Sequence, residues 1–364
     1  MKTKIIASLV VLGLAFSVLM FMFVTGCGVT SGGGTVSNPR LYISDVTNKR
    51  VLIIDPTNLT LLGSVELSGA SSPKWMAIHP DGSKVYIGDE GSNDVFVLRT
   101  SDNSTETITV CFNPRGMTFN STASLLYVLC NQGGSNADIA IIDTSLDSLV
   151  GGINGGFGTY FGSDCYGIDY NPATDKLYVA DRSDNRLLAV PATAGTHTVE
   201  SVSSPSAFPY DVKVAPGGGV VYLSTWTSNM AYLISFEASG MTMVTSWAAQ
   251  DDGFRNIAIS PNGQYLYVGE HDYSYIDSLD LTGGSSLTKI NTRSTPPGAW
   301  LDGIHQIAFS PDSSKAYAVQ FEAGIGTASR EVVIINTAQA TREGAILLPL
   351  PVSGTEYFGI VYKP

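Results

Sequence analysis

Side chains suited to binding polar groups recur at one position of this chain, two places ahead of a short apolar run. Three of the seven occupants are fixed cations, one is a histidine and three are aromatic: Lys74, Arg115, Tyr166, Tyr210, Arg255, His305 and Phe358. Cations and an imidazole placed together around one opening form a site for a polar ligand or an ion. We call this set the mouth ring and expect it to bind a ligand if the fold gathers its members.

A second recurring position lies three places after each of seven regularly spaced tyrosines. It holds Asp45, Asp89, Cys130, Asp181, Thr225, Glu270 and Gln320. We expect its carboxylates, those of Asp45, Asp89, Asp181 and Glu270, to line the same opening and to share in ligand binding. The simpler alternative is that these charges pair with the mouth-ring cations and hold water, since polar groups in a channel need partners with or without a ligand.

The same groups allow a catalytic hypothesis. A histidine would act as general base, an acid would orient it, and an arginine would stabilise an oxyanion. The candidates are His305 or His271, Glu270 or Asp181, and Arg115 or Arg255. The sequence has no Gly-Xaa-Ser-Xaa-Gly elbow, phosphate-binding loop or paired-histidine metal motif. We therefore prefer binding over catalysis.

The elements that must position these residues belong to a sevenfold repeat. Its tyrosines, separated by 44, 41, 51, 44, 45 and 50 residues, are Tyr42, Tyr86, Tyr127, Tyr178, Tyr222, Tyr267 and Tyr317. Such a period is typical of propeller blades. An apolar phrase that usually ends in proline precedes each of the last six tyrosines, and the phrase missing before Tyr42 stands at residues 360 to 364. This offset predicts that the C-terminal strand completes the N-terminal blade and closes a ring.

Each repeat reads as four short strands. In the second copy we expect strands at 75–78, 84–88, 94–99 and 106–110, with a turn of Pro, Asp and Gly type after the first. No helical periodicity appears after residue 26. The sequence therefore predicts an all-β fold, a seven-bladed β-propeller of four-stranded antiparallel blades.

The repeat resembles a known family. The phrases Leu-Tyr-Ile-Ser-Asp at 41–45, Leu-Tyr-Val-Ala-Asp at 177–181 and Leu-Tyr-Val-Gly-Glu at 266–270 are similar to the motif of the YVTN-repeat propellers. The resemblance covers residues 39 to 364 and implies a seven-bladed propeller. Members of that family include surface-layer and other exported proteins, and related propellers include lactonases and cofactor-dependent dehydrogenases. The chain departs from the family pattern at the fourth motif position, which is usually Asn.

The N-terminal residues predict export. Lys2 and Lys4 precede an uncharged run from residue 5 to 24, and Val24, Thr25 and Gly26 precede Cys27. This arrangement resembles a lipoprotein signal, which implies cleavage after residue 26 and lipidation of Cys27. The alternative is an uncleaved anchor, because twenty apolar residues can span a bilayer. Residues 27 to 38 read as a flexible Gly/Ser linker, and 39 to 364 as the propeller.

The net charge and the cysteines limit which classes of partner the protein can have. Without residues 1 to 26 the chain has 18 Lys and Arg against 32 Asp and Glu, a net charge of −14 with histidine neutral. That balance argues against nucleic acid. Three cysteines remain besides Cys27, namely Cys111, Cys130 and Cys165, for which we expect one disulfide and one free thiol. They lack the close spacing of zinc ligands, so we expect no metal.

The connections on one face are the longer ones and are rich in aromatic and acidic residues, as at 155–167, 203–211, 248–256, 293–306 and 321–330. We expect a lipid-anchored protein of the cell envelope, without its own cofactor, that binds a protein or glycan through this face. The alternatives are a lactonase-like hydrolase and a propeller subunit of an exported redox complex.

Overall fold

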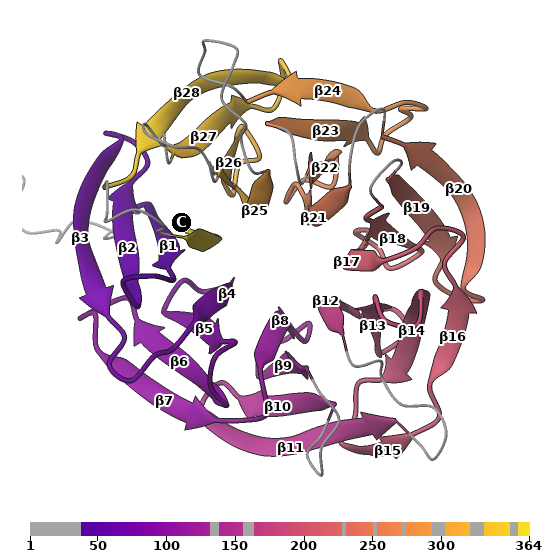
Figure 1. Ribbon diagram of the computed structural model, residues 1–364, viewed down its shortest axis with the longest axis horizontal. Helices are drawn as coiled ribbons and strands as arrows, with labels where there is room; N and C mark the ends of the chain where they lie inside the picture. The colour runs from indigo at the N-terminus through magenta and orange to yellow at the C-terminus, as the bar shows by residue number, and fades with distance from the viewer. Residues whose placement is uncertain are drawn as a thin grey trace, which may run out of the picture. The chain divides into compact units, whose positions relative to one another are not determined.

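The repeats form the blades of a seven-bladed ring (Figure 1). The computed structural model describes residues 38–131, 138–155, 164–227, 231–249, 253–270, 274–292, 303–320, 331–349 and 356–364. These ranges contain strands and no helix, so none of them holds a helix able to cross a membrane. Each blade is an antiparallel sheet whose first strand faces the centre of the ring.

The first three blades follow the predicted order. Blade 1 consists of β29 (Tyr357–Lys363), β1 (Arg40–Asp45), β2 (Arg50–Asp55) and β3 (Thr60–Glu66). Blade 2 consists of β4 (Pro73–Ile78), β5 (Lys84–Asp89), β6 (Asp94–Arg99) and β7 (Thr105–Thr109). Blade 3 consists of β8 (Pro114–Phe119), β9 (Leu125–Cys130), β10 (Ile139–Asp143) and β11 (Ser148–Gly155).

The other four blades repeat this pattern. Blade 4 contains β12 (Cys165–Asn171), β13 (Lys176–Asp181), β14 (Arg186–Pro191) and β16 (Glu200–Ser203). Blade 5 contains β17 (Pro209–Val214), β18 (Val220–Thr225), β19 (Tyr232–Glu237) and β20 (Thr242–Ala248). Blade 6 contains β21 (Phe254–Ile259), β22 (Tyr265–Glu270), β23 (Tyr275–Asp280) and β24 (Thr288–Asn291). Blade 7 contains β25 (Ile304–Phe309), β26 (Lys315–Gln320), β27 (Glu331–Asn336) and β28 (Thr341–Leu347).

The two ends of the propeller meet in blade 1, as the offset of the repeat predicts. Strand β29 pairs antiparallel with β1, and Val361 lies opposite Tyr42. Ile360 and Tyr357 also pack in one buried cluster with residues of β26 and β27. The C-terminal strand therefore completes the N-terminal blade and contacts blade 7.

Blade 3 departs from four strands. The short strand β15 (Gly195–His197), which lies between β14 and β16 in sequence, pairs parallel with β11 through Ile153 and Gly195. The connection in blade 4 that carries β15 is longer than its counterparts, so it reaches the neighbouring outer strand. This pairing covers the edge of β11, which would otherwise present unpaired backbone groups.

Three of the seven repeat tyrosines tie their blade to the next. All seven are buried in the second strand of their blade. The hydroxyl of Tyr127 donates to the carbonyl of Ala192 at 2.8 Å, and that of Tyr178 to Ala238 at 2.8 Å. Tyr86 donates instead to the carboxylate of Asp147 at 2.9 Å. Each of these three partners belongs to the following blade, so Tyr86, Tyr127 and Tyr178 serve both packing and inter-blade hydrogen bonding. The buried hydroxyl of Tyr267 has no hydrogen-bond partner among the described residues.

Glycine allows the inner strands to approach one another. A Cβ on Gly167 would lie 2.6 Å from the Cα of Asp211 on the next blade, and one on Gly359 would lie 2.4 Å from the carbonyl oxygen of Lys74. Both glycines directly follow a mouth-ring residue. The close approach of the backbones at this level brings the mouth-ring side chains of neighbouring blades into contact.

Candidate functional site

The structure brings the mouth ring together. Each member lies at the start of the first strand of its blade, and the first strands surround the centre of the ring (Figure 1). Contacts run from blade to blade around one side. The ring of Phe358 lies 4.9 Å from that of His305, whose Nδ1 lies 3.4 Å from a guanidinium nitrogen of Arg255. Phe358 also contacts blade 2, because Nζ of Lys74 lies 5.6 Å from the centre of the Phe358 ring.

On the remaining side the contacts form a column of four residues from blades 3 to 6. Arg115 lies over the ring of Tyr166 at 3.9 Å, and Tyr166 stacks on Tyr210 with ring centres 4.7 Å apart. The guanidinium of Arg255 lies over Tyr210 at 5.7 Å. Cations attract the faces of aromatic rings, so the column is held by cation–π attraction at both ends. Burial raises the pKa of the Tyr210 hydroxyl, and this effect outweighs the lowering by the charge of Arg255. Tyr210 is therefore neutral.

Carboxylates close the ring between Lys74 and Arg115. Glu90 lies 3.2 Å from Lys74 and 2.7 Å from Arg115, and Arg115 also contacts Asp164 at 2.7 Å. Burial raises the pKa of Asp164, but hydrogen bonds and charge from Arg115 and Arg182 outweigh burial and lower it. Asp164 is therefore ionised and forms ion pairs with both Arg115 and Arg182.

A second aromatic group extends the ring over blades 4 and 5. Arg182 pairs with Asp164 at 2.7 Å and lies over the rings of Phe208 at 5.3 Å and Trp226 at 5.6 Å. Phe208 is 40% exposed and adopts a φ of +54°, which is rare for a bulky residue. The site thus offers solvent a surface of cations and aromatic faces.

The second recurring position is placed differently from the prediction. Its carboxylates were expected at the opening, but Asp45, Asp89, Asp181 and Glu270 are all fully buried. Asp45 accepts a hydrogen bond from Arg50 at 2.9 Å, and Asp181 accepts one from Arg186 at 2.8 Å. In these two blades the carboxylate fixes the turn between the second and third strands and does not face the mouth ring.

The other two carboxylates are also engaged. Asp89 accepts backbone hydrogen bonds from Ser71, at 2.7 Å, and from Ser72. Glu270 lies 2.9 Å from Nζ of Lys289. Burial raises the pKa of the Glu270 carboxyl, and the nearby Asp277 raises it further. Lys289 lowers this pKa, but the net direction is upward. None of the four is available to a ligand in solvent.

The residues that do approach the mouth ring come one place later. Val46 packs with Trp75 and Phe358, while Glu90 and Arg182 directly follow Asp89 and Asp181. These residues are the first after the second strand of their blades, and their side chains reach the mouth ring while the carboxylate before each of them is buried at the end of the strand. No repeated sequence signal marks this position, which holds Val46, Glu90, Asn131, Arg182 and Trp226 in the first five repeats.

The catalytic candidates are not assembled around one point. His305 and Arg255 are adjacent, but Glu270 is buried beside Lys289, and Arg115 is held by Glu90 and Asp164. Arg115 is only 7% exposed. The arrangement of acid, base and oxyanion clamp required for the hydrolase hypothesis is therefore absent from the described residues.

Within the described part of the chain, cysteines and metal-binding groups add no further candidate site. Cys111 and Cys130 form a disulfide, and Cys165 is a buried thiol outside this disulfide. Burial raises the pKa of the Cys165 thiol, which keeps it protonated and unreactive. Within the described ranges, no three His, Cys, Asp or Glu side chains lie close enough together to hold a metal ion.

A cavity of about 520 Å³ lies further along the inner strands of blades 4 to 7. Its lining includes Tyr170, Lys213, Asn256 and Gln306 and none of the mouth-ring residues. Lys213 lies 4.0 Å from Asp211. This second opening provides a comparison for any test of the mouth ring.

Some predicted residues fall outside the described ranges. They are Cys27, His271, and the loop residues at 156–163, 250–252, 293–302 and 321–330.

Comparison with known proteins identifies the fold. No protein-family model matches the chain, and no curated protein is detectably similar in sequence. Solved structures do match. A functionally unknown protein from Desulfotomaculum acetoxidans is 13% identical with a TM-score of 0.67, over 88% of this chain and 99% of that one.

Two other similar structures are named for redox proteins. Hydrazine synthase of Kuenenia stuttgartiensis is 15% identical with a TM-score of 0.58, over 76% of this chain and 80% of that chain. The dihydro-heme d1 dehydrogenase NirN in complex with DHE is 15% identical with a TM-score of 0.59, over 86% of this chain and 64% of that chain. At such identities the likeness shows the propeller fold alone.

Proposed function

We propose that this protein is an exported, membrane-anchored binding module whose mouth ring holds a glycan of the cell envelope. One observation carries the proposal: in an acidic chain, the mouth ring joins cations and aromatic rings from all seven blades through an unbroken series of contacts. Stacked aromatic faces and charged groups are the surfaces that sugars use. Binding is favoured over hydrolysis because the candidate catalytic groups are paired separately.

Export and the YVTN-repeat assignment belong to the same proposal. The uncharged run before Cys27 and the disulfide between Cys111 and Cys130 both fit an oxidising compartment outside the cytoplasm. A lipid on Cys27 would retain the protein at a membrane, since each buried CH₂ of an acyl chain contributes about 0.8 kcal/mol.

The anchor makes the first prediction. Cells expressing the full chain should incorporate radiolabelled palmitate into it, and Cys27→Ser should abolish the label. Cys165→Ser, which removes a buried thiol of the propeller, should stay labelled. An unlabelled wild type that retains residues 1 to 26 by mass spectrometry would establish an uncleaved anchor and contradict lipidation.

The mouth ring makes the second prediction. Tyr210→Ala removes the middle of the four-residue column, so polysaccharide binding should weaken about tenfold. The measurement is affinity electrophoresis of residues 38–364 in gels that contain alginate or dextran. Tyr170→Ala is the matched control, because Tyr170 lies on β12 and lines the opposite cavity. Thermal unfolding would verify that both variants fold.

The outcomes separate the two openings. Loss of retardation in Tyr210→Ala with normal retardation in Tyr170→Ala supports the mouth ring. The reverse pattern would move the site to the cavity near Lys213, and a wild type retarded by neither polysaccharide would remove the glycan as the partner.

A further inference from the structure

The cations of the mouth ring are not equally neutralised. Lys74 lies near Glu90 at 3.2 Å and near Glu356 at 3.4 Å, while Arg115 contacts Glu90 and Asp164, each at 2.7 Å. Arg182 beside them pairs with Asp164 at 2.7 Å. Every one of these cations therefore has a carboxylate within 4 Å.

Arg255 is different. Its contacts within the described residues are with the ring of Tyr210 and with Nδ1 of His305, and no carboxylate of those residues lies against its guanidinium. Arg255 and His305 are both half-buried, so they remain open to solvent. A partly buried guanidinium without a counter-ion has lost hydration and gains strongly when an anion binds.

The two arginines at the ends of the column differ in their neutralisation. Its blade 3 end, Arg115, is covered by two carboxylates, whereas its blade 6 end, Arg255, has none among the described residues. The two ends are separated by the stacked rings of Tyr166 and Tyr210. An anion that arrives at the mouth ring therefore meets a guanidinium without a carboxylate partner among the described residues. This guanidinium belongs to Arg255 and lies beside the ring of Tyr210.

A buried donor lies beside the mouth ring. Trp75 is 6% exposed, and its rings contact Phe358 at 4.9 Å and Tyr166 at 6.2 Å. Its indole N–H has no hydrogen-bond partner among the residues that the structure describes. A buried donor without an acceptor costs free energy, so a ligand oxygen that reaches it would be stabilised.

We propose that Arg255 and His305 form the anion subsite of the mouth ring, and that the ligand is an acidic sugar whose carboxylate binds Arg255. The planar guanidinium donates two parallel hydrogen bonds to a carboxylate, and the sugar ring lies at the edge of Tyr210, whose faces are covered by Tyr166 and Arg255. This assignment rests on the proposed function and specifies its ligand as a uronic-acid-containing glycan.

The test uses small probes on the domain 38–364, measured by isothermal titration calorimetry. Glucuronate carries both ring and carboxylate, glucose the ring alone, and acetate the carboxylate alone. Glucuronate should bind at least tenfold more tightly than either of the other two. Arg255→Gln should weaken glucuronate binding about tenfold, which corresponds to one charge-assisted interaction.

Two further variants make the test specific. Arg255→Lys retains the charge but loses the paired donors, so we expect partial recovery of affinity. Lys176→Gln, on β13 and away from the mouth ring, removes one positive charge from a pair with Glu200 and should bind as wild type. Equal affinity for glucuronate and glucose, or an unchanged affinity in Arg255→Gln, would overturn the anion subsite.

Failure of this inference is distinguishable from failure of the proposed function. If dextran and alginate both retard the wild type and Tyr210→Ala abolishes both effects, the mouth ring binds glycans without selecting acids, and only the anion subsite falls. If neither polysaccharide nor glucuronate binds, both proposals fall.

Discussion

Deletion of residues 356 to 364 should abolish cooperative folding of the propeller. The deletion removes β29, the first strand of blade 1, and exposes an edge of β1 that would otherwise be paired. Tyr357, Phe358, Ile360 and Val361 are all buried. Each such side chain contributes about 1.5–3 kcal/mol on burial, so their sum is comparable with the total stability of about 5–15 kcal/mol of a typical domain.

Circular dichroism and thermal unfolding of residues 38–364 and 38–355 measure this effect. The matched control is removal of Pro364 alone, because this exposed residue follows β29 and leaves the pairing of Val361 with Tyr42 intact. An unchanged melting temperature in the longer deletion would contradict closure of the ring by the C-terminal strand.

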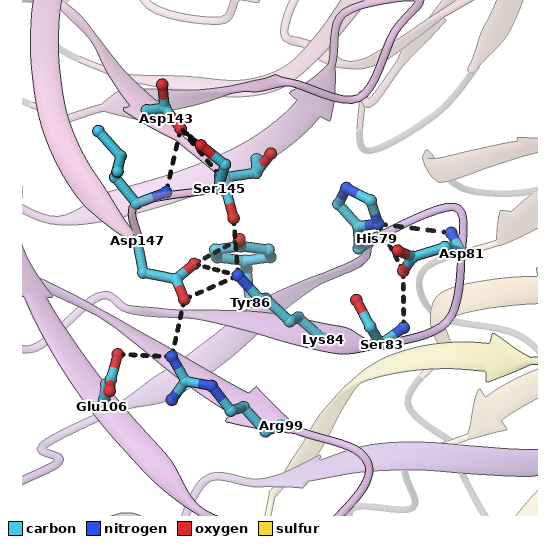
Figure 2. A network of polar contacts seen from close by, with 12 residues as sticks. His79, Asp81, Ser83, Lys84, Tyr86, Arg99, Glu106, Asp143, Ser145 and Asp147 are labelled. Atoms are coloured by element: carbon cyan, nitrogen blue, oxygen red, sulfur yellow. Dashed lines mark hydrogen bonds and ion pairs between the residues drawn. The ribbon is translucent and has the colours of Figure 1, made fainter.

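Asp147→Asn should lower the free energy of unfolding by about 3 kcal/mol. Asp147 follows β10 in blade 3, its side chain is 4% exposed, and it accepts from Lys84 at 2.8 Å and from Arg99 at 3.0 Å (Figure 2). The Tyr86 hydroxyl donates to it at 2.9 Å. Removing the carboxylate charge leaves two cations of blade 2 without their shared partner, so the contact between blades 2 and 3 weakens.

The choice of asparagine separates charge from backbone strain. Asp147 has a φ of +49°, and asparagine tolerates this conformation better than alanine. Asp143→Asn is the control, since Asp143 accepts from Ser145 and Leu146 within its own turn, in the same network of Figure 2. Urea unfolding should show a small loss for Asp143→Asn, and equal losses in the two variants would contradict the inter-blade role of Asp147.

The fold was readable from the sequence because its signals repeat. Tyr42 and its six counterparts marked the second strand of every blade, and the displaced phrase at residues 360 to 364 revealed how the ring closes. The extra strand β15 was not readable, since nothing in the polar run at 195–197 distinguishes a turn from a strand that pairs with a neighbouring blade.

The site was readable in part for the same reason. The mouth ring follows the repeat, so the sequence identified its residues as candidates, and the first strands of the blades bring them together. The carboxylates of the second recurring position were misplaced, because the motif defines the position of Asp89 and Asp181 and not which side of the strand each side chain faces. Glu90 and Arg182, which do reach the mouth ring, appear in only some blades and left no repeated signal.

The most direct measurement of the central claim is a crystal structure of residues 38–364 with glucuronate. We predict that the sugar carboxylate lies on the guanidinium of Arg255, with the sugar ring against Tyr210 and the Arg115 end of the column still covered by Glu90 and Asp164. A guanidinium of Arg255 paired with a carboxylate of its own chain, with glucuronate absent from the mouth ring, would contradict the claim.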